Sequence, residues 1–365
     1  MQEKNIYDII IENCTKEWKK SMAITKLSWE KPEYSKKKIE KAGKILAKEN
    51  PTHAEILDAL NVLNNWRSSH AYPLHVITNN LKRNNPNAIV VQRLKRLDSI
   101  VGKIRRFPEM SLYKMQDLGG CRVIVNSIND VYLSVARFKN SHIRHIFKKE
   151  NDYILNPKES GYRSYHMVYQ YQSNDNDTYN KNMLIEIQFR TKLQHIWATA
   201  VEVMGVYTKS HLKASQGNED VLRFFVLASS IFAQEENMPI CPNTINNKEL
   251  LISEMKKIDN RLQLISKLSA ISVAIDFTNK NKRLEGKGYY LLRLNLQEKY
   301  VKINGYNTTE ITLATNVYNK IEAVNNPNMD TVLVSATSFE DLKQAYPNYF
   351  ADISTFVNKM RNLLK

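Results

Sequence analysis

The segment 184-LIEIQFRT-191 alternates apolar and polar side chains, and this alternation constrains the fold more than any other feature of the sequence. Alternate side chains of a β-strand point to opposite faces of a sheet. We therefore expect the two central isoleucines and the phenylalanine to face a core, while Glu186, Gln188 and Arg190 share the other face. These polar groups are costly to bury without partners, so they meet solvent, each other or a ligand. A plain exposed face with a Glu–Arg pair is the alternative.

Other segments predict a mixture of strands and helices. Short β-rich runs bounded by turn residues are typical of strands, and apolar residues at three- and four-residue spacings are typical of helices. The expected strands are 121–127, 165–172, 184–191, 289–296, 299–305 and 331–337. The expected helices lie within 1–90, over 88–107, 192–207 and 221–235, within 245–280, over 308–324 and, as a pair, after 337. The fold class is α+β: a mixed β-sheet flanked by helices.

The chain of 365 residues, 42% of them apolar, is long enough for two or three compact domains. Changes in pattern suggest a helical N-terminal region, a central sheet domain, a helical connector and a small α+β C-terminal module. Their proposed bounds are 1–90, 91–240, 241–282 and 283–365.

The scattered cysteines and the N-terminus predict a soluble cytoplasmic protein. Cys14, Cys121 and Cys241 are too far apart for a disulfide framework, and no spacing suggests zinc. Acidic residues interrupt the first apolar run, which excludes a signal peptide. The longest apolar segment, 221–233, is too short to span a membrane and contains Arg223, so no membrane contact is expected.

The charge of the chain favours phosphate-bearing partners. Lysine and arginine total 53 against 37 acidic residues, which gives a net charge of +16. Such an excess attracts nucleotides or RNA, although a merely solvated cationic face is the alternative. Six cations crowd the segment 93-RLKRLDSIVGKIRR-106, and some of them are placed to clamp a triphosphate.

Two acidic residues are candidate ligands for Mg²⁺. Asp117 precedes the Gly119-Gly120 turn into one expected strand, and Glu186 lies on another. If the strands are neighbours, the pair can hold a Mg²⁺ that bridges polyphosphate oxygens. Asp117 alone more often caps a turn. His195, in the following helix, is equally compatible with a site residue and with a structural histidine.

The segment 152-DYILNPKESGYRSYH-166 presents an aromatic ring on a tight loop. Tyr162 follows Gly161 and precedes a strand, so its ring is expected at a rim, where it can stack on a nucleobase. Lys158, Arg163 and His166 are the neighbouring donors to phosphate or ribose.

Three motifs together resemble the RelA/SpoT synthetase family of alarmone synthetases over roughly residues 90–210. They are D-L-G-G-C-R-V-I-V, D-Y-I-x-N-P-K-x-x-G-Y-R-S-Y-H and E-I-Q-F-R-T-x-x-Q-H, in that order. The resemblance implies a nucleotidyltransferase-like core. It also implies transfer of the β,γ-pyrophosphate of ATP to a ribose 3′-hydroxyl. No His-Asp dipeptide occurs, so the hydrolase half of the long enzymes is not expected, and the chain is similar to small stand-alone synthetases.

The resemblance also assigns roles to individual residues. Asp117 and Glu186 are the implied catalytic residues and Mg²⁺ ligands. The implied ATP contacts are Arg93, Lys95, Lys103 and Arg122. The implied acceptor contacts are Lys158, Tyr162, Arg163, His166, Gln188 and Arg190. Whether Glu186 is a base or a metal ligand stays open.

The acceptor implied by the resemblance is the 3′ end of tRNA, with GDP or GTP as the alternative. Relatives that use guanine nucleotides carry lysine just before D-Y-I, where this chain has Asn151 within the run Asn151-Asp152. Lys148 and Lys149 lie upstream, where an RNA backbone would be held. A catalytically inactive RNA- or protein-binding module is the remaining alternative.

Residues 283–365 resemble the C-terminal module of fused toxin–antitoxin synthetases, the CapRel class. The likeness includes a Y-x-x-Y element at Tyr346 and Tyr349. It implies a self-inhibited toxin in phage defence, whose tail blocks the ATP site until a phage structural protein binds. The alternative is that both tyrosines are ordinary core residues.

Overall fold

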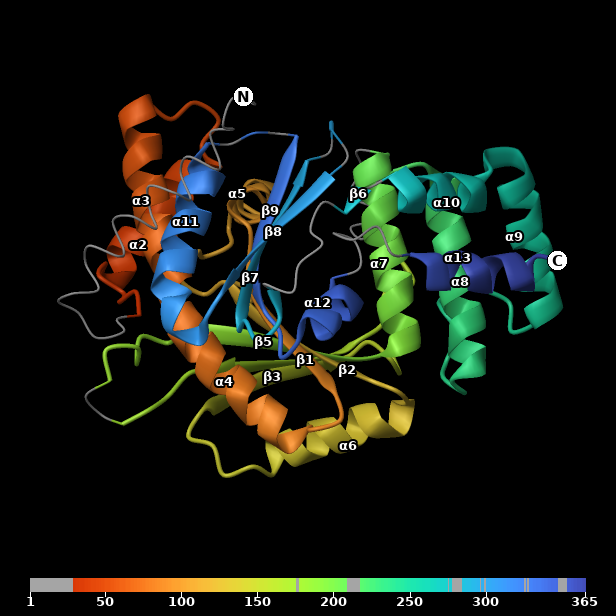
Figure 1. Cartoon of the computed structure of the whole chain (residues 1–365), viewed down its shortest axis with the longest axis horizontal. Coiled ribbons are helices and arrows are strands. Elements are labelled where there is room, and N and C mark those ends of the chain that lie inside the picture. Colours follow the sequence, from red (N-terminus) through yellow and green to blue (C-terminus); the bar gives the residue numbers. More distant parts are fainter. Residues whose placement is uncertain are drawn as a thin grey trace.

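The computed structural model describes most of the chain after residue 28. The described ranges are 29–174, 177–208, 217–274, 276–277, 284–295, 297–298, 300–324, 326, 328–346 and 353–365. They form helices and one large sheet, which confirms the α+β class (Figure 1). Within these ranges no helix combines the length and the apolar character that crossing a membrane requires.

Among the described residues, three helices precede the sheet: α2 (Lys36–Ala47), α3 (His53–Ser69) and α4 (Ala71–Asn84). This confirms that helices lie within 1–90 where the chain is described, while residues 1–28 lie outside. Thr52 begins α3 with a capping box, in which its side chain and that of Glu55 each accept a hydrogen bond from the other's backbone N–H.

The described strands form a nine-stranded mixed sheet in the order β3-β4-β5-β2-β1-β9-β7-β8-β6. β2 and β5 are parallel, as are β6 and β8, and the other neighbours are antiparallel. The bounds are β1 Ile89–Leu94, β2 Gly119–Val125, β3 Ile146–Asp152, β4 Tyr165–Gln170, β5 Leu184–Thr191, β6 Asp276–Phe277, β7 Tyr289–Asn295, β8 Tyr300–Tyr306 and β9 Met329–Ser335.

The expected helix over 88–107 is wrong in its first half. Ile89–Leu94 forms β1, antiparallel to β2, and only Leu97–Arg106 forms a helix, α5. The run Ile-Val-Val at the start of β1 is β-branched and fits a pleated sheet better than a helix. Its pairing with β2 places Arg93 opposite Gly120.

The sheet buries one face beneath two helices. α4 and α6 (Ile128–Lys139) lie together along this face in Figure 1, and their apolar side chains pack against β1, β2, β4 and β5. Ile185, Ile187 and Phe189 are fully buried in this core, as the alternation in β5 predicts. The polar side chains of β5 therefore point to the opposite face.

Strand β3 was not expected from the sequence. It is an edge strand paired only with β4 among the described strands, and most of its side chains are exposed. Its sequence, IFKKEND, carries little apolar alternation, because an edge strand buries few side chains.

A cluster of helices lies at one end of the molecule (Figure 1). α7 (Lys192–Tyr207) and α8 (Glu219–Glu235) confirm the two helices expected after the motif strands. α9 (Lys248–Leu262) and α10 (Leu264–Ala274) fill the expected connector, and α13 (Ser354–Leu363) packs into the same apolar core.

The tail has the expected strand–strand–helix–strand order, but its strands do not form a separate sheet. β9 pairs with β1 at Gln92–Ser335 and Arg93–Val334, so β7, β8 and β9 extend the sheet that carries the motifs. A 3₁₀ turn at Thr308–Glu310 precedes α11 (Ile311–Ala323), and α12 is Phe339–Ala345. The proposed domain boundaries remain predictions.

Candidate active site

Two acidic residues meet where the parallel strands β2 and β5 run side by side. Gly120 is in register with Glu186, and Asp117 lies two residues before the start of β2. A cavity of about 110 Å³ opens between them. Its lining residues are Arg93, Lys95, Asp117, Gly120, Cys121, Arg122, Glu186, Gln188 and Tyr346. Three cations and two carboxylates thus share one small cavity.

Asp117 is held by two lysines. Its Oδ2 lies 2.9 Å from Nζ of Lys95, and its Oδ1 lies 3.0 Å from Nζ of Lys103. Burial raises the pKa of Asp117, but the two ammonium groups outweigh burial and leave the pKa below its ordinary value. Burial lowers the pKa of Lys95, against the opposing effect of Asp117. Asp117 is therefore an anion with cations already beside it.

Glu186 accepts a hydrogen bond at each carboxylate oxygen. His166 Nδ1 lies 3.1 Å from Oε1, and Gln188 Nε2 donates to Oε2 at 2.7 Å. Burial alone would raise the pKa of Glu186, but these hydrogen bonds and the nearby positive charges lower it to about 2. Such a carboxylate is ionised at neutral pH and is a poor proton acceptor.

Five side chains close a ring of hydrogen bonds at Glu186. Arg190 donates to Oε1 of Gln188 at 2.8 Å and also to the hydroxyl of Tyr162, and that hydroxyl lies 2.8 Å from Nε2 of His166. The His166 ring therefore joins Tyr162 at Nε2 to Glu186 at Nδ1. The ring fixes the direction in which the Glu186 carboxylate points.

The expected exposed position of Tyr162 is wrong. Its side chain is only 9% exposed and packs in the helical core, and Arg190 lies 5.0 Å from the ring centre. The hydroxyl points inward because it forms hydrogen bonds with both His166 and Arg190. Gly161 enforces this turn: its φ is +85°, and a Cβ there would lie 3.0 Å from Trp197.

Tyr153 is a more accessible ring that the sequence reasoning missed. It is half-buried, its ring centre lies 5.2 Å from that of His166, and Lys158 Nζ lies 4.4 Å from its ring centre. Burial lowers the pKa of Lys158. The sequence carried a signal for this residue, because Tyr153 belongs to the D-Y-I motif that begins the segment 152–166.

Arg163 does not reach the cavity. It is buried among the helices, where its guanidinium donates to Oγ of Ser229 at 3.0 Å and to the carbonyl oxygen of Ile154 at 3.1 Å. Its assignment as an acceptor contact is therefore not supported. Consecutive residues of an extended segment point in opposite directions, which separates Arg163 from Tyr162.

The tail reaches the cavity through the end of α12. Tyr346 is buried and lines the cavity, and the Arg122 guanidinium lies 5.7 Å from its ring centre. Arg122 also donates to the carbonyl oxygen of Ala345 at 3.0 Å, and burial lowers its pKa to about 10. Figure 1 shows α12 between the sheet and α7. Tyr349 lies outside the described residues.

His195 contacts the tail rather than the carboxylates. Its Nε2 lies 2.9 Å from the carbonyl oxygen of Gln344, and burial lowers its pKa well below the ordinary value. His195 is therefore neutral, and Nε2 donates to that carbonyl. This contact joins the tail to α7, in addition to its contacts with Arg122.

The two carboxylates fit a magnesium site of the kind completed by a substrate. Among the described residues no cluster of three or more His, Cys, Asp or Glu side chains is placed to hold a metal alone. Mg²⁺ in nucleotide sites is bound by one or two carboxylates together with phosphate oxygens and water. Asp117 and Glu186, on the wall of a cationic cavity, supply such a pair.

Comparison with known proteins shows that the segment with most of the cavity residues matches a known protein region. Residues 92–211 match the model described as "Region found in RelA / SpoT proteins". GTP pyrophosphokinase YjbM of Bacillus subtilis is 35% identical over 116 residues, which are 31% of this chain and 54% of that protein. GTP pyrophosphokinase YwaC of the same organism is 33% identical over 120 residues, 32% of this chain and 56% of that protein. The chain thus spans about half the length of these relatives.

A solved structure is also similar. The small alarmone synthetase 1 of Bacillus subtilis, bound to its product pppGpp, is 26% identical and matches 48% of this chain and 94% of its own, with a TM-score of 0.39. The sequence match covers all the residues of the cavity except Tyr346. The segment 92–211 of this chain is therefore similar to the region found in RelA and SpoT proteins.

Proposed function

We propose that the protein is an ATP-dependent pyrophosphokinase, which transfers the β,γ-pyrophosphate of ATP to a ribose 3′-hydroxyl. The observation that carries the proposal is the pair Asp117 and Glu186 on one cationic cavity within the RelA/SpoT-like segment. The 3′-oxygen attacks the β-phosphorus and loses its proton to solvent, the bond from that phosphorus to the α,β-bridging oxygen breaks, and AMP leaves. Such a transfer depends mainly on positioning and charge neutralisation.

The cations of the cavity suit a triphosphate. Arg93, Lys95 and Arg122 line it, and Lys103 reaches Asp117 from α5. Asp117 and Glu186 would hold a Mg²⁺, which neutralises charge on the polyphosphate when bound. The low pKa of Glu186 favours a role as metal ligand or hydroxyl acceptor over a general base.

The acceptor we propose is the 3′ end of tRNA. Lys148 and Lys149 are exposed on the edge strand β3, and Asn151 is in register with His166 of the hydrogen-bond ring. Two exposed lysines on the edge strand suit contact with a phosphate backbone. The second candidate acceptor is GDP or GTP, favoured by the relatives that are named GTP pyrophosphokinases.

The C-terminal module, by this proposal, inhibits the enzyme as part of a toxin that acts in phage defence. Tyr346 occupies part of the cavity wall, and Ala345 and Gln344 accept hydrogen bonds from Arg122 and His195. A triphosphate would compete with Tyr346 for Arg122. A phage structural protein that withdraws α12 would expose the site.

Label transfer from ATP tests the activity. The full chain and its Tyr346→Ala variant are incubated with Mg²⁺, γ-labelled ATP and either deacylated tRNA, GDP or GTP. We expect label in tRNA, abolished by Glu186→Gln and unaffected by Glu159→Gln, which alters an exposed glutamate between β3 and β4. Label only in guanosine tetra- or pentaphosphate would select the second acceptor. No transfer to any acceptor by either protein would contradict the proposal.

A further inference from the structure

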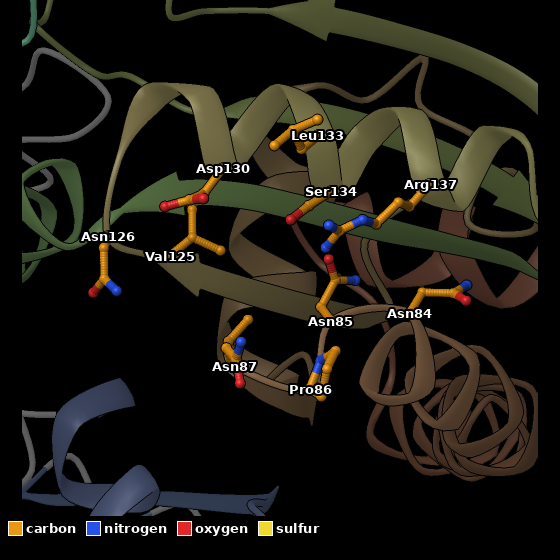
Figure 2. A pocket seen from close by; sticks show the side chains of 11 residues that line it. Asn84, Asn85, Pro86, Asn87, Val125, Asn126, Asp130, Leu133, Ser134 and Arg137 are labelled. Carbon is orange, nitrogen blue, oxygen red and sulfur yellow. The ribbon is translucent and has the colours of Figure 1, made fainter.

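A second, larger cavity lies at the other end of strand β2. It has a volume of about 420 Å³ and is formed where α4 ends, β1 begins, β2 ends and α6 begins (Figure 2). The site of the carboxylates lies near Gly120, whereas this cavity includes Val125. Strand β2 has seven residues, so the two ends are roughly 20 Å apart at about 3.3 Å per residue. The cavity is thus separate from the candidate active site.

Asn85 brings an unpartnered acceptor into this cavity. The side chain is 4% exposed. Its Nδ2 donates to the carbonyl oxygen of Leu81 at 2.9 Å, while its Oδ1 has no hydrogen-bond partner. A buried amide oxygen without a partner costs free energy, and such groups are rare in folded proteins. Figure 2 shows the Asn85 side chain pointing into the cavity toward Arg137. A ligand with an N–H donor would satisfy Oδ1.

Arg137 supplies a positive charge at this cavity. It projects from α6 over the cavity, and its guanidinium makes no hydrogen bond or ion pair with another residue in the described ranges. The carboxylate of Asp130 also lines the cavity, but its Oδ2 accepts from the backbone N–H and the hydroxyl of Ser127. Asp130 lies seven residues, about 10 Å, along the helix from Arg137. An anionic group is therefore favoured at the Arg137 end.

The remaining walls are suited to a small molecule of mixed polarity. Ser134 contributes a hydroxyl, while Val125 and Leu133 contribute apolar surface. Sites for small ligands are usually a few hundred Å³ in volume, with a few placed polar groups among apolar ones. A molecule that fits carries an anionic group for Arg137, an N–H donor for Asn85 and apolar surface for Val125 and Leu133. Nucleoside monophosphates combine these three properties.

We propose that this cavity is a binding site for a nucleoside monophosphate, with the phosphate on Arg137 and an N–H group of the base on Asn85. The proposal is independent of the function proposed above. Arg137 and phosphate form charge-assisted hydrogen bonds in which the planar guanidinium donates twice. The orphan acceptor at Asn85 and the unpaired cation at Arg137 are satisfied together by the one ligand.

Isothermal titration calorimetry of the full chain tests the proposal, with AMP, GMP and inorganic phosphate as probes. We expect at least one mononucleotide to bind, and Arg137→Ala to weaken this binding by about tenfold or more. Arg83→Ala is the matched control, because it removes an exposed cation from the adjoining end of α4 that does not line the cavity. Glu186→Gln alters the candidate active site but not this cavity, so we expect it to leave the Arg137-dependent binding unchanged.

Three results would overturn the proposal. The first is that neither AMP nor GMP binds. The second is that Arg137→Ala leaves the binding intact, and the third is that inorganic phosphate binds as tightly as the mononucleotides. The last would show that the base makes no contact with Asn85. Arg137 is exposed, so its substitution is expected to leave the thermal melting of the protein unchanged, and that melting curve is recorded for every variant.

Discussion

Gly120 and Glu186 stand opposite one another across the parallel pair β2–β5, and a Cβ at Gly120 would meet only the backbone oxygen of Glu186, 3.9 Å away. The absence of a side chain at Gly120 leaves the space between Asp117 and Glu186 open. The two carboxylates therefore face one cavity instead of being divided by a side chain.

If the proposed self-inhibition holds, removal of the Tyr346 ring is expected to activate the proposed enzyme. Tyr346 lines the cavity and stacks near Arg122, so Tyr346→Ala frees both the space and the guanidinium. If the form with an open cavity is a minor one in the wild-type protein, the substitution raises the apparent affinity for ATP by about tenfold or more. ATP-analogue binding by calorimetry measures this. Tyr300→Ala, a tail tyrosine outside the cavity, is the control, and equal affinities for both variants would count against self-inhibition.

Loss of Glu322 is expected to destabilise the protein. Its Oε2 lies 3.0 Å from NH1 of Arg67, whose side chain is fully buried, and also accepts from the backbone N–H of Leu97 at 2.9 Å. Glu322→Ala leaves a buried cation without its carboxylate, which costs about 3–5 kcal/mol of unfolding free energy. Urea denaturation measures the loss.

The matched control is the exposed pair of Lys38 and Asp58, 3.5 Å apart. Lys38→Ala is expected to change the unfolding free energy by at most about 1 kcal/mol. A similar small effect of Glu322→Ala would mean that the tail contributes little to the stability of the sheet.

Two glycine substitutions are expected to have opposite signs. Gly161→Ala forces an alanine to φ +85° with its Cβ 3.0 Å from Trp197, which costs about 1–3 kcal/mol. Gly102→Ala lies in α5 with no atom within 4 Å, and gains about 0.5–1 kcal/mol from helix propensity. Thermal melting compares the two. Equal and small shifts would contradict the strained turn before Tyr162.

The stability contributed by Glu186 is expected to depend on pH. Its pKa is about 2 in the folded protein against 4.5 as the ordinary value. Because the folded pKa is the lower one, the stabilisation is fully present above about pH 4.5 and is lost as the pH falls toward 2. Wild type should therefore exceed Glu186→Gln in unfolding free energy at pH 7, with the difference shrinking below pH 4.5. A difference that does not vary with pH would exclude the assigned hydrogen bonds.

The sequence predicted the local elements of the site better than their partners. The alternation in β5 correctly assigned Ile185 and Glu186 to opposite faces, because side-chain period is a local property of a strand. The sequence pattern of 88–107 did not distinguish strand β1 from the helix α5 that follows, since a short apolar run is compatible with both a strand and a helix. The contact of β1 with β9, at Gln92 and Ser335, joins residues far apart in sequence and has no local signal.

The same limit explains the outcomes for the loop that carries Tyr162. A glycine turn before Tyr162 was evident from the residues, and its φ of +85° agrees. The direction of the ring depended on His166 and Arg190, which the turn itself does not specify. Arg163 follows directly in sequence but is directed toward Ser229 of α8, a position that only the packing of the helices determines.

The most direct test of the central claim is a double-mutant cycle on Asp117 and Glu186, with initial rates of label transfer from γ-labelled ATP as the measurement. If both carboxylates serve one magnesium-bound triphosphate, Asp117→Asn and Glu186→Gln each lower the rate by about 10² or more, and the double variant loses little beyond the worse single one. Losses that multiply in the double variant, or a single variant that keeps the wild-type rate, would contradict a shared role.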